Sequence, residues 1–244
     1  MRALSAPELL GVWERGLVQQ PAERALALLA AACPGTPPEA LAKLSIGQRD
    51  ATLLALRELT FGPEYAGLTT CSGCAKRLEL TFDVAEIQMG PEGEPAETAS
   101  LTVTDYELRF RLPNSLDLAA VTEQTDVARA RLLLFDRCLL SADHRGKEMS
   151  ADQLPAEVID AVAERMAQAD PQADVQLAIS CPSCGHQWRC AFDIVSFFWA
   201  ELNAWACRIL REVHQLASVY GWHEADILAM SPWRRQTYLE IVGV

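Results

Sequence analysis

Two cysteine pairs with identical spacing are the residues of this chain best suited to chemistry. "CSGCAKRLELTFDV" begins at Cys71 and "CPSCGHQWRCAFDI" at Cys181, and the two align without a gap. A tight turn that carries C-x-x-C brings two sulfurs to one side, and zinc takes four thiolate or imidazole ligands in a tetrahedron. The spacing therefore predicts one structural zinc site made by Cys71, Cys74, Cys181 and Cys184. In this interpretation neither pair binds the metal alone.

Other uses of the thiols are open at this point. A redox dithiol sits where a strand runs into a helix, whereas "RLELTF" and "QWRCAF", which follow the two motifs, alternate as strands do. Unmetallated thiols or a disulfide are further alternatives. In the alignment Cys190 falls on Leu80 and His186 on Lys76, so we expect an apolar strand residue and a solvent-facing polar residue rather than ligands.

Composition limits the classes of partner. The 244 residues include eight cysteines, half are hydrophobic, and the net charge is −12. The first sixty residues contain as many basic as acidic side chains, so nearly all the excess negative charge lies in residues 61–193. Such a surface repels phosphate backbones, which argues against a nucleic-acid partner.

The chain has no segment typical of a membrane or secreted protein. No run of about eighteen uncharged apolar residues is present. "MRALSAPELLGVWERG" is interrupted by Glu8, Glu14 and Arg15 and lacks the apolar core of a signal peptide. We expect a cytoplasmic protein, in which eight cysteines favour metal ligands or buried thiols over disulfides.

Nothing in the sequence assembles a catalytic site. It contains no Gly-rich phosphate loop, nucleophile elbow or HExxH motif. A catalytic zinc needs about three protein ligands and an open position, whereas four thiolates close the coordination sphere. The sequence therefore predicts a protein that is not an enzyme.

The periodicity of the chain predicts a mostly helical α+β fold. Helical N- and C-terminal parts would surround a small antiparallel zinc-ribbon-like unit, with a polar loop at 89–100. We expect one compact unit with five regions. They are N-terminal helices (1–62), the first knuckle with β-strands (63–112), a helical insertion (113–172), the second knuckle (173–193) and C-terminal helices (194–244).

The last region carries the strongest helical pattern. One apolar stripe predicts a long helix that stops before Gly221; its members are Phe198, Leu202, Trp205, Ile209, Val213, Leu216 and Tyr220. Aromatic residues also face other directions around its beginning, so this helix is either central in the fold or partly covered by another protein. The second interpretation names four candidate partner-binding residues: Phe197, Trp199, Trp205 and Trp233.

The order of these motifs resembles a known family. "GVWERG" (11–16), "PAERALALLAAA" and "GQRDATLLALRELTFG" leading into "CSGC" are similar to the T-even-phage-like baseplate hub assembly chaperone family, as encoded in extracellular contractile injection system gene clusters. "LAISCPSCGHQWRCAFDI" and the ending "EADILAMSPWRRQTYLEIV" resemble the same family. The resemblance covers nearly the whole chain and is weakest over 85–112 and 140–153.

The resemblance implies a cytoplasmic assembly factor for the baseplate or central hub of a phage-tail-like particle. Its partner would be a hub or spike protein, and incorporation into the finished particle is left open. Two alternatives remain, a permanent structural baseplate subunit and a zinc-ribbon nucleic-acid-binding regulator. The family contributes no residue roles beyond the thiolate pairs.

Overall fold

The computed structural model of the protein describes residues 1–89 and 98–243, and it divides the chain into two compact units. One unit joins Met1–Gly35 to Ile194–Val244, and the other is Thr36–Asp193. We expected a single compact unit, and the structure instead separates the two chain ends from the middle. The expected loop at 89–100 lies mostly outside the described residues. With 56 % helix and small antiparallel sheets, the predicted α+β, mostly helical class is confirmed.

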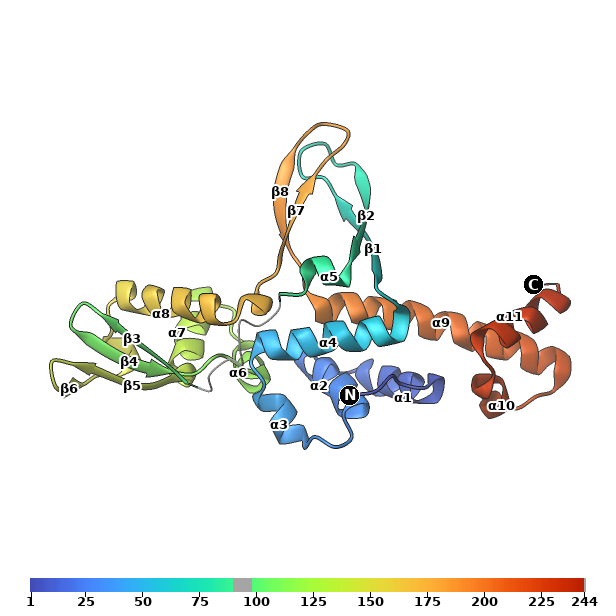
Figure 1. Ribbon diagram of the computed structural model, residues 1–244, viewed down its shortest axis with the longest axis horizontal. Coiled ribbons are helices and arrows are strands. Elements are labelled where there is room, and N and C mark those ends of the chain that lie inside the picture. Colours follow the sequence, from blue (N-terminus) through green and yellow to red (C-terminus); the bar gives the residue numbers. More distant parts are fainter. Residues whose placement is uncertain (90–97, 244) are drawn as a thin grey trace. The chain divides into compact units, whose positions relative to one another are not determined.

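The unit made by the chain ends is entirely helical in its described residues. Its helices are α1 (Ala6–Gly16), α2 (Pro21–Ala32), α9 (Ile194–Tyr220), α10 (Glu224–Ala229) and α11 (Pro232–Ile241). In Figure 1 the first two are blue and the last three run from orange to red. Capping sets where they begin. In α1 the Glu8 carboxylate accepts a hydrogen bond from the Ser5 N–H at 2.9 Å, and the Ser231 hydroxyl accepts one from Arg234 N–H at the start of α11.

Helix α9 has the length and the buried face that its apolar stripe predicts. Its 27 residues end at Tyr220, and Gly221 follows with φ +68°, a left-handed conformation that favours glycine. The stripe faces the core, as shown by the buried side chains of Phe198, Leu202, Ile209, Val213 and Leu216.

The middle unit, Thr36–Asp193, contains all the strands of the described residues. Its helices are α3 (Pro38–Lys43), α4 (Ile46–Phe61), α5 (Val84–Ile87), α6 (Ser115–Val121), α7 (Val127–Cys138) and α8 (Ala156–Ala169), with short 3₁₀ turns η1 (Ala151–Gln153) and η2 (Pro171–Ala173). The strands form one four-stranded sheet and two separate hairpins.

The four-stranded sheet lies where the resemblance to the family is weakest. Its strands, in spatial order, are β3 (Ala99–Val103), β4 (Tyr106–Phe110), β5 (Leu139–His144) and β6 (Lys147–Glu148). Side chains from β4 and β5 pack with those of α7 and α8 into one apolar cluster, which includes Leu108, Phe110, Phe135, Ala142, Val158 and Val162.

This sheet corrects one expectation. Residues 113–172 were expected to be a helical insertion, but strands β5 and β6 also lie in this range. A tight turn joins the two strands, with Arg145 at φ +55° and Gly146 at φ +82°. Consecutive positive φ angles are typical of the turns that connect short hairpins.

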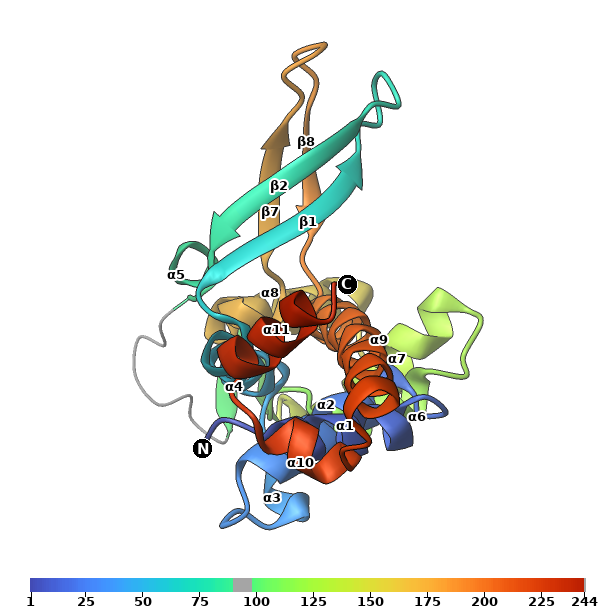
Figure 2. The same ribbon diagram turned by 90° about the vertical axis from the view of Figure 1, so that its right-hand side faces the viewer.

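The two hairpins contain the cysteine motifs. Strands β1 (Glu64–Thr70) and β2 (Arg77–Asp83) pair antiparallel, as do β7 (Gln176–Ser180) and β8 (Gln187–Ala191). This confirms the antiparallel ribbon-like strands expected around each motif. Figure 2 shows the hairpins running in the same direction away from α4 and α5 of this unit. In neither unit does a described helix have the length and apolarity required to cross a bilayer.

Helix α1 offers a test of packing inside the first unit. A Cβ added at Gly16 would lie 2.1 Å from Cη2 of Trp199, whereas one added at Gly11 meets nothing closer than Arg15 Nη1 at 3.4 Å. Gly→Ala normally stabilises a helix by about 1 kcal/mol. We predict that Gly11→Ala raises the free energy of unfolding in this way, and that Gly16→Ala lowers it by about 1–3 kcal/mol because the core is overpacked.

The measurement is urea denaturation of both variants and the parent, followed by circular dichroism. Equal stabilisation by both substitutions would show that Trp199 does not pack against Gly16.

Candidate metal centre

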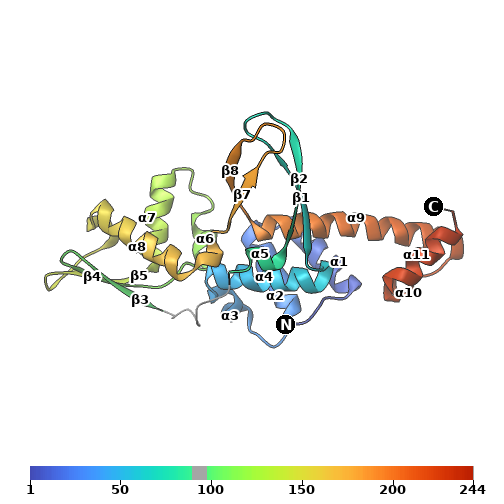
Figure 3. The ribbon, with the colours of Figure 1, turned by 45° about the horizontal axis from the view of Figure 1, so that its top comes forward.

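Each C-x-x-C motif is the turn at the far end of a hairpin. The last paired residues before the first turn are Thr70 and Arg77, and before the second they are Ser180 and Gln187. Figure 3 shows the two turns next to each other, although 107 positions separate Cys74 from Cys181. The strands therefore deliver two distant pieces of sequence to one place.

The two turns have the same backbone hydrogen bonds. In the first, Cys71 N–H donates to Lys76 O at 2.9 Å and Ala75 N–H donates to Cys71 O at 2.9 Å. In the second, Cys181 N–H donates to His186 O at 2.8 Å and Gly185 N–H to Cys181 O at 2.9 Å. The ungapped sequence repeat is thus a repeat of structure.

The four sulfurs form one compact group. The Sγ atoms of Cys71, Cys74, Cys181 and Cys184 all lie within 4.8 Å of one another. Cys71 Sγ is 3.7 Å from Cys184 Sγ, and Cys74 Sγ is 3.7 Å from Cys181 Sγ. Four sulfurs about 2.3 Å from a tetrahedral zinc would be about 3.8 Å apart. A disulfide needs an S–S distance of about 2.05 Å, so the cross-hairpin distances match shared coordination of a cation.

The environment of the group favours a thiolate at Cys181 in particular. The side chains of Cys71 and Cys181 are 2 % and 1 % exposed, while Cys74 and Cys184 face outward. Burial raises the pKa of Cys181, but hydrogen bonds from Ser183 and Cys184 N–H and from neighbouring thiols outweigh it and lower that pKa to about 6. A backbone hydrogen bond from His186 lowers the pKa of Cys184, but hydrogen bonds with neighbouring thiols and burial outweigh it and raise that pKa to about 12. A thiolate is the form that binds a metal.

A contact outside the sulfur group joins the turns to each other. Ser72 Oγ lies 2.9 Å from His186 Nε2. A Cβ added at Gly73 would be 3.0 Å from both Cβ and Cγ of His186, so glycine permits this approach. His186 was expected only to face solvent; it is exposed, but it also packs across the other turn. The sequence repeat gave no signal for this contact because the aligned residue is Lys76.

Aromatic side chains hold the hairpins together at the opposite end. Tyr65 stacks on Phe82 within the first hairpin at 5.2 Å between ring centroids. Phe192, which follows the second hairpin, meets these rings edge-on at 5.5 Å and 5.6 Å. The Arg57 guanidinium lies 3.7 Å from the Tyr65 ring centroid and donates to Gly62 O and Glu64 O. These residues were not among the candidates from sequence.

The remaining cysteines are outside the sulfur group. Cys190 lies on β8 opposite Leu177 of β7, and its side chain is half-buried. Cys138 is buried, and Cys33 and Cys207 are half-buried. Within the described residues the four motif cysteines are the one set of His, Cys, Asp and Glu side chains placed to hold a metal ion.

The four candidate partner-binding aromatic residues have different surroundings. Trp199 is half-buried, with the Arg24 guanidinium 4.4 Å from its ring. Trp205 packs against the apolar core of α9, α10 and α11, and Phe197 is half-buried. Trp233 is 80 % exposed. Of the four, Trp233 alone presents most of its surface to solvent.

Comparison with known protein families gives a match over most of the chain. A family model described as "T4 bacteriophage base plate protein" matches residues 18–199, which include both cysteine pairs. No curated protein and no solved structure matches the chain.

Equivalent positions in the two turns allow a pair of substitutions with opposite expected effects on stability. Ala75 has φ +58° and Gly185 has φ +72°. The left-handed conformation costs a residue with a Cβ roughly 1–2 kcal/mol, partly offset by the greater unfolded-state freedom of glycine. We predict that Ala75→Gly stabilises the protein by about 0.5–1 kcal/mol and that Gly185→Ala destabilises it by a similar amount. Denaturation of the two variants at fixed metal concentration measures both. Shifts of the same sign would contradict the structural equivalence of the turns.

Proposed function

The chain belongs to the T4 bacteriophage base plate protein family, and from that premise we propose that it is a non-enzymatic assembly factor for the baseplate or central hub of a phage-tail-like contractile injection particle. The family match is the observation that carries this proposal. The partner would be a hub or spike protein. Of the candidate contacts, Trp233 is the most exposed and is the first to test.

We further propose that Cys71, Cys74, Cys181 and Cys184 hold one structural zinc ion. Support comes from the 3.7 Å sulfur distances between hairpins and from an all-cysteine donor set, which suits zinc. When bound, the ion would link two hairpins that share no sheet in the described structure. Four protein ligands leave no position for a substrate, so the role of the site is structural.

One alternative has a specific observation in its favour. The description of the matching family names a base plate protein, which suits a permanent subunit of the particle as well as a factor that leaves it. A zinc-ribbon nucleic-acid regulator has less support, because acidic residues outnumber basic ones in the unit that holds the sulfur group.

Mass spectrometry of purified particles, together with deletion of the gene, tests the proposed role. We expect deletion to abolish complete particles and the protein to be absent from finished ones, because an assembly factor acts only during construction. A stoichiometric amount in finished particles would favour the permanent subunit instead. Normal particles made without the gene would overturn both roles.

Metal analysis tests the zinc site. We expect about one zinc per chain, and a large loss of zinc in Cys74→Ser and Cys184→Ser, because three thiolates no longer complete the tetrahedron. Cys190→Ser is the matched control and should keep its zinc. Elemental analysis after dialysis measures the ratio, and retention of zinc in all three variants would exclude this site.

A further inference from the structure

The middle unit has a groove remote in sequence from the cysteine motifs. Its volume is about 770 Å³, and its walls come from the end of α3, the start of α4, the end of β4, the start of α6 and β5. Two leucines on its wall, Leu116 and Leu140, are each 49 % exposed. Exposed leucines beside a concave surface provide apolar area that a bound segment can cover.

Charge in the groove is opposite to charge in the rest of its unit. The charged residues among its described lining are Lys43 and Arg111, both basic. Over Thr36–Asp193 as a whole, 25 acidic residues oppose 14 basic ones. A basic groove in an acidic unit favours a ligand whose negative charges are local, and electrostatic complementarity of this kind gives specificity.

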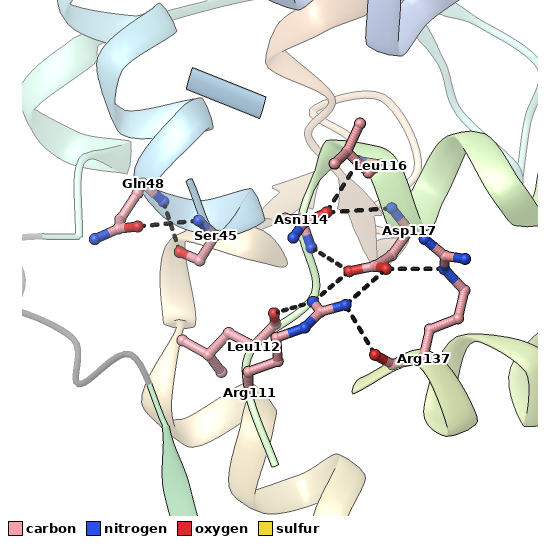
Figure 4. Close-up of polar contacts among 8 residues, drawn as sticks. All are labelled: Ser45, Gln48, Arg111, Leu112, Asn114, Leu116, Asp117 and Arg137. Carbon is pink, nitrogen blue, oxygen red and sulfur yellow. Dashed lines mark hydrogen bonds and ion pairs between the residues drawn. The ribbon is translucent and has the colours of Figure 1, made fainter. Parts of the chain in front are cut away.

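The ion pairs behind the groove leave positive charge uncompensated. Asp117 is fully buried, and its Oδ1 accepts hydrogen bonds from Arg111 Nη2 and Arg137 Nε, each at 2.9 Å, as Figure 4 shows. One carboxylate thus faces two guanidinium groups, whose side chains are 28 % and 36 % exposed. Burial alone would raise the pKa of Asp117, but its hydrogen bonds to Arg111, Asn114 and Arg137 lower it. Since this aspartate stays ionised, the group of three carries one net positive charge.

Backbone contacts fix the two walls to each other. Ser45 and Asn114, the capping residues of α4 and α6, form an isolated antiparallel bridge. Ile46 N–H donates to Pro113 O at 3.1 Å. Both caps are occupied by their own helices, with Gln48 N–H donating to Ser45 Oγ and Leu116 N–H to Asn114 Oδ1 (Figure 4). The groove is therefore formed before any ligand binds, which lowers the ordering cost of binding.

We propose that this groove binds an extended segment of a partner protein in which acidic side chains alternate with apolar ones. Carboxylates of the segment pair with Lys43 and with the exposed edge of Arg111, and its apolar side chains cover Leu116 and Leu140. The proposal rests on the proposed function only in that the partner would belong to the baseplate; the binding itself requires no zinc and no particle.

A display library of random peptides provides a probe that presumes no partner. We expect selection on the full-length zinc-loaded protein to enrich peptides that combine Asp or Glu with Leu or Ile. Fluorescence anisotropy of one enriched peptide then measures the dissociation constant. Lys43→Glu should weaken binding about fivefold or more, since reversal of one charge exchanges attraction for repulsion, and added salt should weaken parent binding.

Matched controls separate the groove from general charge and hydrophobicity. Lys147→Glu makes the same charge change at another exposed lysine, and Leu68→Ser is the counterpart of Leu140→Ser at an exposed strand leucine. We expect the two control variants to bind as the parent does and Leu140→Ser to bind more weakly. Equal loss in control and groove variants, or enrichment of no peptide or of peptides without acidic residues, would overturn the proposal.

Two other occupants are distinguishable outcomes. Binding of a single-stranded oligonucleotide that is lost in Lys43→Glu, with no peptide binding, would replace the peptide with a phosphate backbone. Peptide binding that occurs only after Glu92, Glu94 and Glu97 are replaced by Gln would assign the groove to this chain's own acidic residues. If deletion of the gene left particles normal while the peptide still bound, the proposed baseplate role would be wrong. The proposal that the groove binds a peptide would stand.

Discussion

The convergence of four cysteine sulfurs is the constraint on which the middle unit depends. Each hairpin is an isolated two-stranded sheet, and such a pair of strands is marginally stable in water by itself. With cross-hairpin sulfur distances of 3.7 Å, both tips would contribute ligands to a single bound ion. A crosslink between residues 107 positions apart also removes much of the conformational freedom of the unfolded chain. A bound ion would therefore stabilise far more than the turns it touches.

At the opposite end, aromatic packing and hydrogen bonds hold the hairpins. There Tyr65, Phe82 and Phe192 bury aromatic area, and Arg57 fixes the chain entering the first hairpin. Stacked and edge-on ring pairs add to the free energy of simple burial. Because this contact does not depend on thiolates, it would hold the bases of the hairpins close together without an ion as well. A bound ion and the aromatic contacts would thus act on the same pair of hairpins from opposite ends.

The sequence was sufficient where one local pattern dictates the structure. Equal C-x-x-C turns predicted the sulfur group, and the stripe from Phe198 to Tyr220 predicted α9 and its end. The sequence was insufficient for contacts between unlike residues, such as the contact between Ser72 and His186. Neither segment has a pattern that indicates its partner. Strands β5 and β6 were missed because apolar and polar residues do not alternate regularly in "LLSADH". The Arg145-Gly146 turn was the one sequence feature that indicated a hairpin. The division into two units depends on which helices share a core, which periodicity does not specify.

The extent of the family match separates two kinds of structure in this chain. Both cysteine pairs and the groove lie inside residues 18–199. The buried core shared by α1, α9, α10 and α11 is built from Leu10 and from residues 206–239, all outside that range. The unmatched ends therefore pack on each other and form the surroundings of the second half of α9. The match thus covers the middle unit together with α2 and the start of α9, whereas Trp233 lies on α11, beyond the matched range.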